Sequence, residues 1–105
     1  MVLPLILPPL PLHPKHDVLR VNEILTKGYH VARCILDLVQ PDLHQIHYHK
    51  ERIWSEFVPL LDIILESTSD TATRSWCHAV TMTFTHLFHQ LTECEALAKH
   101  RFAFS

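Results

Sequence analysis

Glycine is almost absent from this chain: Gly28 is the only glycine among 105 residues. Hairpin turns in β-sheets rely on glycine, because its backbone reaches positive φ angles at little cost, so a fold with many strands is disfavoured. The same scarcity excludes Gly-rich phosphate-binding loops and the dinucleotide-binding fingerprint. Since 48% of the residues are apolar and 19% are charged, the composition is that of a globular protein. We therefore expect an all-α fold.

Proline is concentrated at the N-terminus, where residues 1–16 hold five of the seven prolines. Proline fixes φ and has no amide donor, so this stretch is predicted to be an extended lead-in. Between Pro8 and Pro14 lie two short patterns of the kind that bind domains with aromatic grooves. Pro8-Pro9-Leu10-Pro11 is typical of WW-domain ligands, and Pro11-Leu12-His13-Pro14 followed by Lys15 resembles an SH3-domain ligand. The alternative is an irregular lead-in that binds neither.

The apolar N-terminus does not have the features of a signal peptide. It lacks a basic leading region, and Pro4, Pro8 and Pro9 would break the apolar helix that a signal needs. No other stretch approaches about 20 uninterrupted apolar residues, the length of a membrane-spanning helix. The three cysteines include no C-x-x-C pair and imply no disulfide framework. A cytoplasmic protein without a transmembrane segment is expected.

Apolar residues at helical spacing predict a helical domain over residues 17–100, followed by a tail at 101–105. The first helix should begin at Asp17 as N-cap and end before Pro41, and Gly28 leaves open one kinked helix or two shorter ones. Its apolar stripe consists of Val18, Val21, Leu25, Gly28, Ala32, Ile35 and Val39. Residues 43–49 could be a helical turn or extended. Further helices are predicted over 50–67 and about 71–99, joined by a turn at 67–70.

Pro59 lies inside the second predicted helix, where an isolated helix would lose about 3 kcal/mol of stability. Packing must therefore hold that helix together around a bend. The surrounding stretch, residues 57–88, resembles a HEAT repeat of the HEAT/armadillo superfamily. The matching residues are Val58-Pro59-Leu60-Leu61 and Ile64-Leu65 in the first helix, Ser69-Asp70 in the turn, and Arg74, Ala79-Val80 and Phe84 or Leu87 in the second helix, whereas Trp76 and Cys77 replace the small residues usual before Ala79.

The resemblance implies antiparallel helix pairs of HEAT/armadillo type, with structural roles for Pro59, Asp70 and Arg74, the last two pairing between neighbouring repeats. Residues 32–65 are also similar to eukaryotic armadillo-like helical-domain proteins linked to Golgi maintenance, through Tyr48, Glu51, Trp54 and Ser55 followed by Leu60-Leu61. That similarity implies a role in membrane trafficking at the periphery of Golgi membranes.

Helical repeats normally need about three or more units to bury their apolar faces, and this chain supplies two helix pairs. We therefore expect a fragment or short form of an α-solenoid protein, or self-association. A compact three- or four-helix bundle is the structural alternative. A truncated product without independent function is the corresponding functional alternative.

Histidine is unusually frequent, with ten residues. Two groups have spacings that can bring imidazole ligands together on a helix: His44, His47 and His49, and His86 with His89. No zinc-finger or H-E-x-x-H spacing is present, and a solvated helix face explains the same pattern. No metal or cofactor is expected, with a His-rich metal-binding module as the alternative.

The sequence offers no set of residues suited to catalysis. Cys77 and His78 are adjacent, so on a helix they point about 100° apart, and no serine elbow or carboxylate pair is present. We expect no enzymatic activity and no catalytic residues. A net charge of −2 argues against nucleic-acid binding. The expected function is a scaffold that binds other proteins, with four aromatic residues as candidate anchors: Trp54, Phe57, Phe84 and Phe88.

Overall fold

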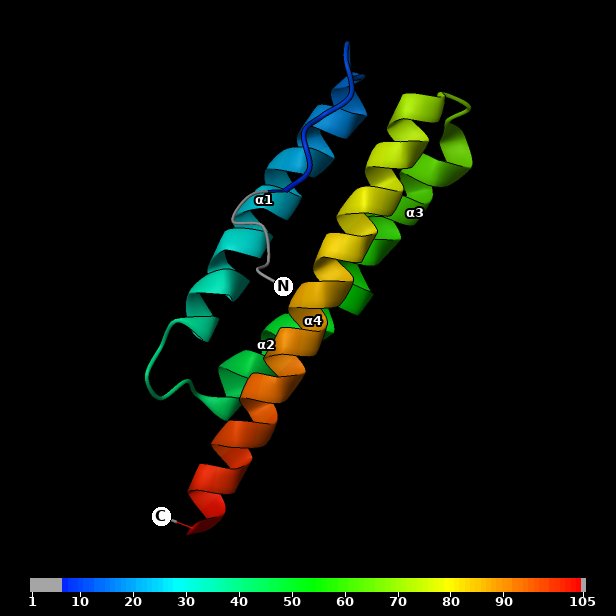
Figure 1. Ribbon diagram of the computed structural model, residues 1–105. Helices are drawn as coiled ribbons and strands as arrows, with labels where there is room; N and C mark the ends of the chain where they lie inside the picture. Colours follow the sequence, from blue (N-terminus) through cyan, green and yellow to red (C-terminus); the bar gives the residue numbers. More distant parts are fainter. Residues whose placement is uncertain (1–6, 105) are drawn as a thin grey trace.

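The computed structural model describes residues 7–104, without the side chains of Phe102 and Phe104, and this part of the chain is helical with no strand (Figure 1). Its elements are α1 (His16–Leu36), α2 (Leu43–Arg52), the short π-helix η1 (Ile53–Phe57), α3 (Val58–Ser67) and α4 (Thr71–Phe104). Because α2, η1 and α3 follow one another without a break, they form one continuous helix, called the central rod below. The all-α prediction is confirmed, as three helices packed together.

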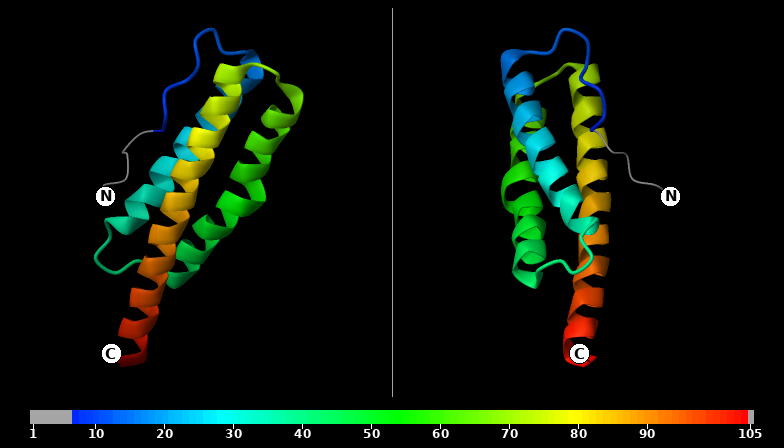
Figure 2. Two further views of the ribbon diagram at one scale, coloured as in Figure 1. Left: turned by 45° about the vertical axis from the view of Figure 1, so that its right-hand side comes forward. Right: turned by 90° about the vertical axis from the view of Figure 1, so that its left-hand side faces the viewer.

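The three helices lie lengthwise against one another in an elongated molecule of 52 × 24 × 19 Å. Figures 1 and 2 show α1 and α4 running in the same direction, with the central rod antiparallel to both. α4 has 34 residues, so it is about 51 Å long and its last turns extend beyond the neighbouring helices. The chain thus forms one antiparallel hairpin, α3–α4, and a first helix packed beside it.

Three aromatic rings, one from each helix, meet at the centre of the core. The ring of Phe84 lies 5.2 Å from that of Phe57 and 5.8 Å from that of Tyr29, and all three side chains are at most 1% exposed. Aliphatic side chains extend this core in both directions: Leu25, Ile46, Ile53, Leu61, Val80, Leu87 and Leu91 are each fully buried. Burial of this apolar surface is the main force that holds the helices together.

α1 is one unbroken helix, and Gly28 is a point of close packing within it. A Cβ atom at this position would overlap with Cζ of Phe57 and lie 2.7 Å from Cε2. The absence of a side chain therefore lets the central rod approach α1, which explains why the only glycine of the chain sits inside a helix. The break considered for Gly28 is absent, because α1 runs without interruption from His16 to Leu36.

The ends of α1 differ from the prediction. Lys15 is the N-cap and gives no side-chain hydrogen bond, while Asp17 lies in the first turn and accepts from the amide of Val18 at 2.9 Å. At the other end, Asp37 and Leu38 donate to carbonyls three residues back, which closes the helix at Leu36. Val39, expected on the buried stripe, is 86% exposed because it lies in the loop that turns the chain toward α2.

The central rod accommodates Pro59 through η1. The amide of Val58 donates to the carbonyl of Ile53, five residues back, so the backbone is wider immediately before the proline. Pro59 follows as the second residue of α3, so the wider backbone lies on the side where the proline ring would crowd the preceding turn. Residues 43–49, left open above, are helical, because Asp42 caps α2 by accepting from the amide of His44 at 2.7 Å.

The turn between α3 and α4 is fixed by Asp70 and Arg74, two of the three residues for which structural roles were expected. Asp70 Oδ2 accepts from the amide of Thr73 at 3.0 Å and from its hydroxyl at 2.6 Å, which caps α4. These bonds hold the pKa of the Asp70 carboxyl below its usual value. Arg74 Nη1 donates to the carbonyl of Leu65 at 2.8 Å and satisfies the end of α3. Both side chains thus serve this hairpin itself; pairing between repeats stays a prediction.

Substituting Gly28 by alanine tests the close approach of α1 and the central rod. Alanine has the higher helix propensity, by about 1 kcal/mol, but a packed core resists an inserted methyl by about 1–3 kcal/mol. Phe57 cannot move away easily because it is held against Phe84. The net effect expected for Gly28→Ala is a loss of up to about 2 kcal/mol in the free energy of unfolding in urea.

The control is Lys27→Ala, an exposed position on the same turn, which should change stability by less than about 0.5 kcal/mol. The double variant Gly28→Ala/Phe57→Leu should lose less than the sum of the two single variants, since the smaller side chain makes room for the methyl. A Gly28→Ala protein that is more stable than the parent would contradict the packing described here.

Candidate interaction surface

The most exposed tryptophan of the described chain belongs to η1. Trp54 is 46% exposed, and its ring meets the ring of Phe88 on α4 edge-to-face, with centroids 5.5 Å apart. Phe88 is itself half-buried and packs against the core. We call Trp54 and Phe88 the aromatic ledge. It spans the seam between the central rod and α4, so its two rings are held by two different helices.

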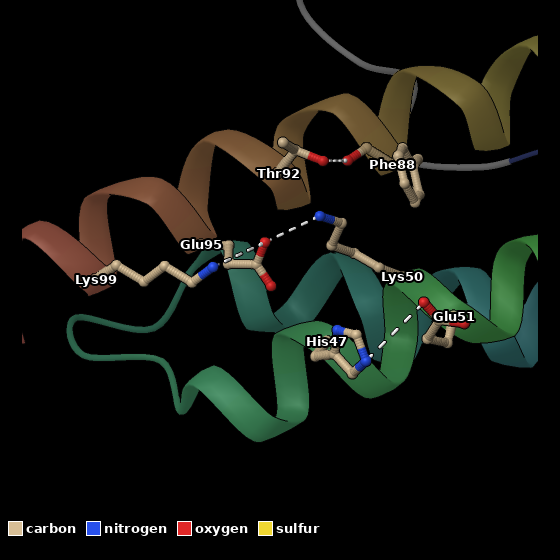
Figure 3. A network of polar contacts seen from close by, with 7 residues as sticks. All are labelled: His47, Lys50, Glu51, Phe88, Thr92, Glu95 and Lys99. Carbon is tan, nitrogen blue, oxygen red and sulfur yellow. Dashed lines mark hydrogen bonds and ion pairs between the residues drawn. The ribbon is translucent and has the colours of Figure 1, made fainter.

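A pair of opposite charges lies beside the aromatic ledge on the same seam (Figure 3). Lys50 Nζ donates to Glu95 Oε1 at 3.0 Å and lies 5.0 Å from the centre of the Phe88 ring. Both side chains are about 15% exposed. The hydrogen bond from Lys50 and the positive charges nearby hold the pKa of the Glu95 carboxyl below its usual value. The Lys50 ammonium thus contacts both Glu95 and the ring of Phe88.

Weaker ion pairs surround this centre. Lys99 Nζ lies 3.9 Å from Glu95 Oε1, and His47 Nε2 lies 3.9 Å from Glu51 Oε1, a contact that is an ion pair only when the imidazole is protonated. The His47 and Glu51 side chains are about two-thirds exposed. An apolar centre within a rim of mixed charge is the usual composition of a protein–protein contact surface. Lys50 and Glu95 were missed at the sequence level because they are 45 residues apart and form no local pattern.

The other two predicted anchors, Phe57 and Phe84, are not at this surface. Phe57 is 1% exposed and Phe84 is fully buried, so they belong to the core and cannot reach a partner. The error for Phe84 has a physical reason. α4 packs against both α1 and the central rod, so its buried face is wider than the stripe of a helix that packs on one neighbour only.

The histidines do not converge on a metal. On α2, His49 is buried while His44 and His47 are exposed, and on α4 His86 and His89 lie on the outer side. Among residues 7–104, no group of three or more His, Cys, Asp or Glu side chains is arranged to hold an ion. Burial of His49, with a smaller effect of Arg52, lowers the pKa of its imidazole.

The candidate nucleophile Cys77 is fully buried, and burial raises the pKa of its thiol, which makes it a poor nucleophile. A surface pocket of about 520 Å³ lies between the α1–α2 loop and the end of α4. Two of its polar side chains already serve the backbone there. Asp42 caps α2, and Arg101 donates to the carbonyl of Val39 at 2.9 Å.

In the part of the chain that the structure covers, no helix is both long and apolar enough to cross a membrane. Comparison of the chain with protein-family models, with curated proteins and with solved structures gives no match.

The buried imidazole of His49 predicts how stability depends on pH. Its pKa is lowered in the folded state, so the unfolded state binds a proton more readily, and stability falls as the pH drops below about 6.5. We expect His49→Gln to reduce the loss of melting temperature between pH 7.5 and pH 5. The exposed neighbour His47, changed to glutamine, is the matched control. An equal pH dependence in His49→Gln and the parent would rule out this contribution.

The Lys50–Glu95 pair should contribute measurably to stability because it is mostly shielded from water. Exposed ion pairs are worth up to about 1 kcal/mol, and breaking a buried pair costs about 3–5 kcal/mol. The Lys50–Glu95 pair lies between these two cases, so we expect Glu95→Gln to lower the free energy of unfolding in urea at pH 7 by about 1–2 kcal/mol. Glu51→Gln, which removes the exposed partner of His47, should cost less than about 0.5 kcal/mol. Similar losses in both variants would contradict the distinction.

Proposed function

We propose that this chain is a non-enzymatic protein–protein interaction module whose contact surface is the aromatic ledge. The observation that carries the proposal is the exposure of a tryptophan ring, 46% accessible, in a position fixed by a second aromatic ring from another helix. Tryptophan is the residue type most enriched among the side chains that dominate binding energy at protein interfaces. If a partner covered the exposed part of the ring, more apolar surface would be removed from contact with water, which favours binding.

The geometry of the aromatic ledge favours binding because its side chains are already held in place before a partner binds. The ring of Phe88 contacts both Lys50 and Trp54, and Lys50 is in turn held by Glu95. A partner that covers Trp54 therefore meets a preorganised surface and loses less conformational entropy on association. The mixed charges of the rim suit a partner surface that also carries both signs.

The same proposal includes the architecture that the sequence suggests, a unit of HEAT/armadillo type from a longer α-solenoid that serves membrane trafficking at the cytoplasmic face of the Golgi. Two observations support it. The α3–α4 hairpin has Pro59 near the start of its first helix, and Asp70 and Arg74 fix the turn between the helices. Such a unit would bind partners along a helix-lined surface, and the aromatic ledge would be part of that surface.

The proposal predicts that Trp54 matters more for binding than for folding. A photoreactive residue at position 54 would first identify the partner by cross-linking. With that partner purified, Trp54→Ala should raise Kd by about thirtyfold or more, the roughly 2 kcal/mol typical of a central contact residue. Because almost half of the ring is exposed, the free energy of unfolding should fall by only about 1 kcal/mol.

Ile63→Ala is the matched control, since Ile63 is 62% exposed and belongs to the same central rod. Its Kd should equal that of the parent chain. Loss of affinity in Ile63→Ala but not in Trp54→Ala would move the contact surface away from the aromatic ledge. A turnover activity that depends on the buried Cys77 would overturn the non-enzymatic assignment.

A further inference from the structure

The proline-rich segment before α1 shows a pattern of burial that repeats every three residues. Leu7 is buried and Leu10 is partly buried, both packed against the core. Pro9 and Leu12 are exposed, Leu12 at 89%, while Pro8 and Pro11 are intermediate. Figures 1 and 2 show this segment running back beside the helices from the end where α1 begins. The segment therefore lies against the helical body along one of its sides only.

A period of three residues is the repeat of a polyproline II helix. The sequence enforces this conformation locally, because the prolines at 8, 9 and 11 fix φ, and a residue that precedes proline is pushed toward extended ψ. Residues 7–11 thus have three ridges, and the chain bends at Leu12 and His13. The inner ridge is Leu7 and Leu10, the side ridge is Pro8 and Pro11, and the outer ridge is Pro9, followed at the bend by the exposed Leu12.

His13 ends this conformation. Its φ is +55°, in the left-handed region, which a polyproline II helix cannot include. Pro11 and Pro14 therefore do not belong to one continuous polyproline II helix, and the SH3-type pattern is interrupted at its third residue. The WW-type pattern, Pro8-Pro9-Leu10-Pro11, lies wholly before the break. The backbone distinguishes the two ligand patterns that the sequence left open.

We propose that residues 7–12 are a docking site for a domain of WW type, which the helical body presents by holding the inner ridge. A three-ridged helix lying in a groove contacts it with two ridges, and the side and outer ridges are the two that face solvent here. Aromatic grooves of WW domains bind proline ridges of this kind. Because Leu7 and Leu10 already order the backbone, a partner domain needs to fix less of it on binding. This site is separate from the aromatic ledge.

The test is a calorimetric titration of the 105-residue chain with an isolated WW domain that binds Pro-Pro-Leu-Pro peptides. The chain should bind about three- to tenfold more tightly than a free peptide of residues 7–15, because its segment is preorganised. Pro11→Ala should weaken binding by about tenfold, since it removes a contact from the side ridge. Pro14→Ala, beyond the break at His13, is the matched control and should change Kd less than about twofold.

Three outcomes would overturn the proposal: no binding, equal losses for Pro11→Ala and Pro14→Ala, or a free peptide that binds more tightly than the chain. A tighter-binding free peptide would mean that packing against the helical body hides the segment from the WW domain. Leu7→Ser should detach the inner ridge from the helical body while it keeps every proline. The affinity of this variant for the WW domain should therefore fall to that of the free peptide. Trp54→Ala should leave binding of the WW domain unchanged, so this site and the aromatic ledge can fail independently.

Discussion

The contact between Gly28 and the ring of Phe57 sets the geometry on which the rest of the molecule depends. It fixes how closely α1 approaches the central rod, and Phe57 in turn packs on Phe84, which reaches Tyr29. The three helices therefore meet through a single cluster of rings at the middle of the core. Any side chain at position 28 would push α1 outward and loosen all three contacts at once. The one glycine of the chain is thus kept for close packing, while turns are made by capping residues such as Asp42 and Asp70.

The π-helical segment η1 connects the core to the surface. It ends two residues before Pro59 and joins α2 to α3. Within its five residues, Ile53 and Phe57 point into the core while Trp54 stays almost half exposed beside Phe88. Inserted turns of this kind often coincide with functional positions in helical proteins. Here one local widening of the backbone both accommodates a proline and presents the aromatic ring on which the proposed binding function rests.

Local patterns in the sequence were sufficient for much of the fold. The helical fold class follows from glycine scarcity and apolar spacing, and the buried positions Val18, Leu25 and Ile35 of α1 lie where the spacing put them. What failed depends on contacts between distant residues. The role of Gly28 needs Phe57, and the burial of Phe84 needs two neighbouring helices, so neither can be read from one helix. At the candidate site Trp54 was identified, but the Lys50–Glu95 pair beside it was not, because it joins two helices that meet only in the folded chain.

The shared direction of α1 and α4 has an electrical consequence. Each helix carries a dipole, with about half a positive charge at its N-terminus and half a negative charge at its C-terminus. The central rod, antiparallel to both, can offset only one of the two parallel helices, so the backbone keeps an uncompensated dipole along the 52 Å axis. The effect of this dipole is concentrated at the first and last turns of the helices, because water and salt screen it elsewhere. The helix arrangement therefore gives the molecule a polarity that its small net charge of −2 does not reveal.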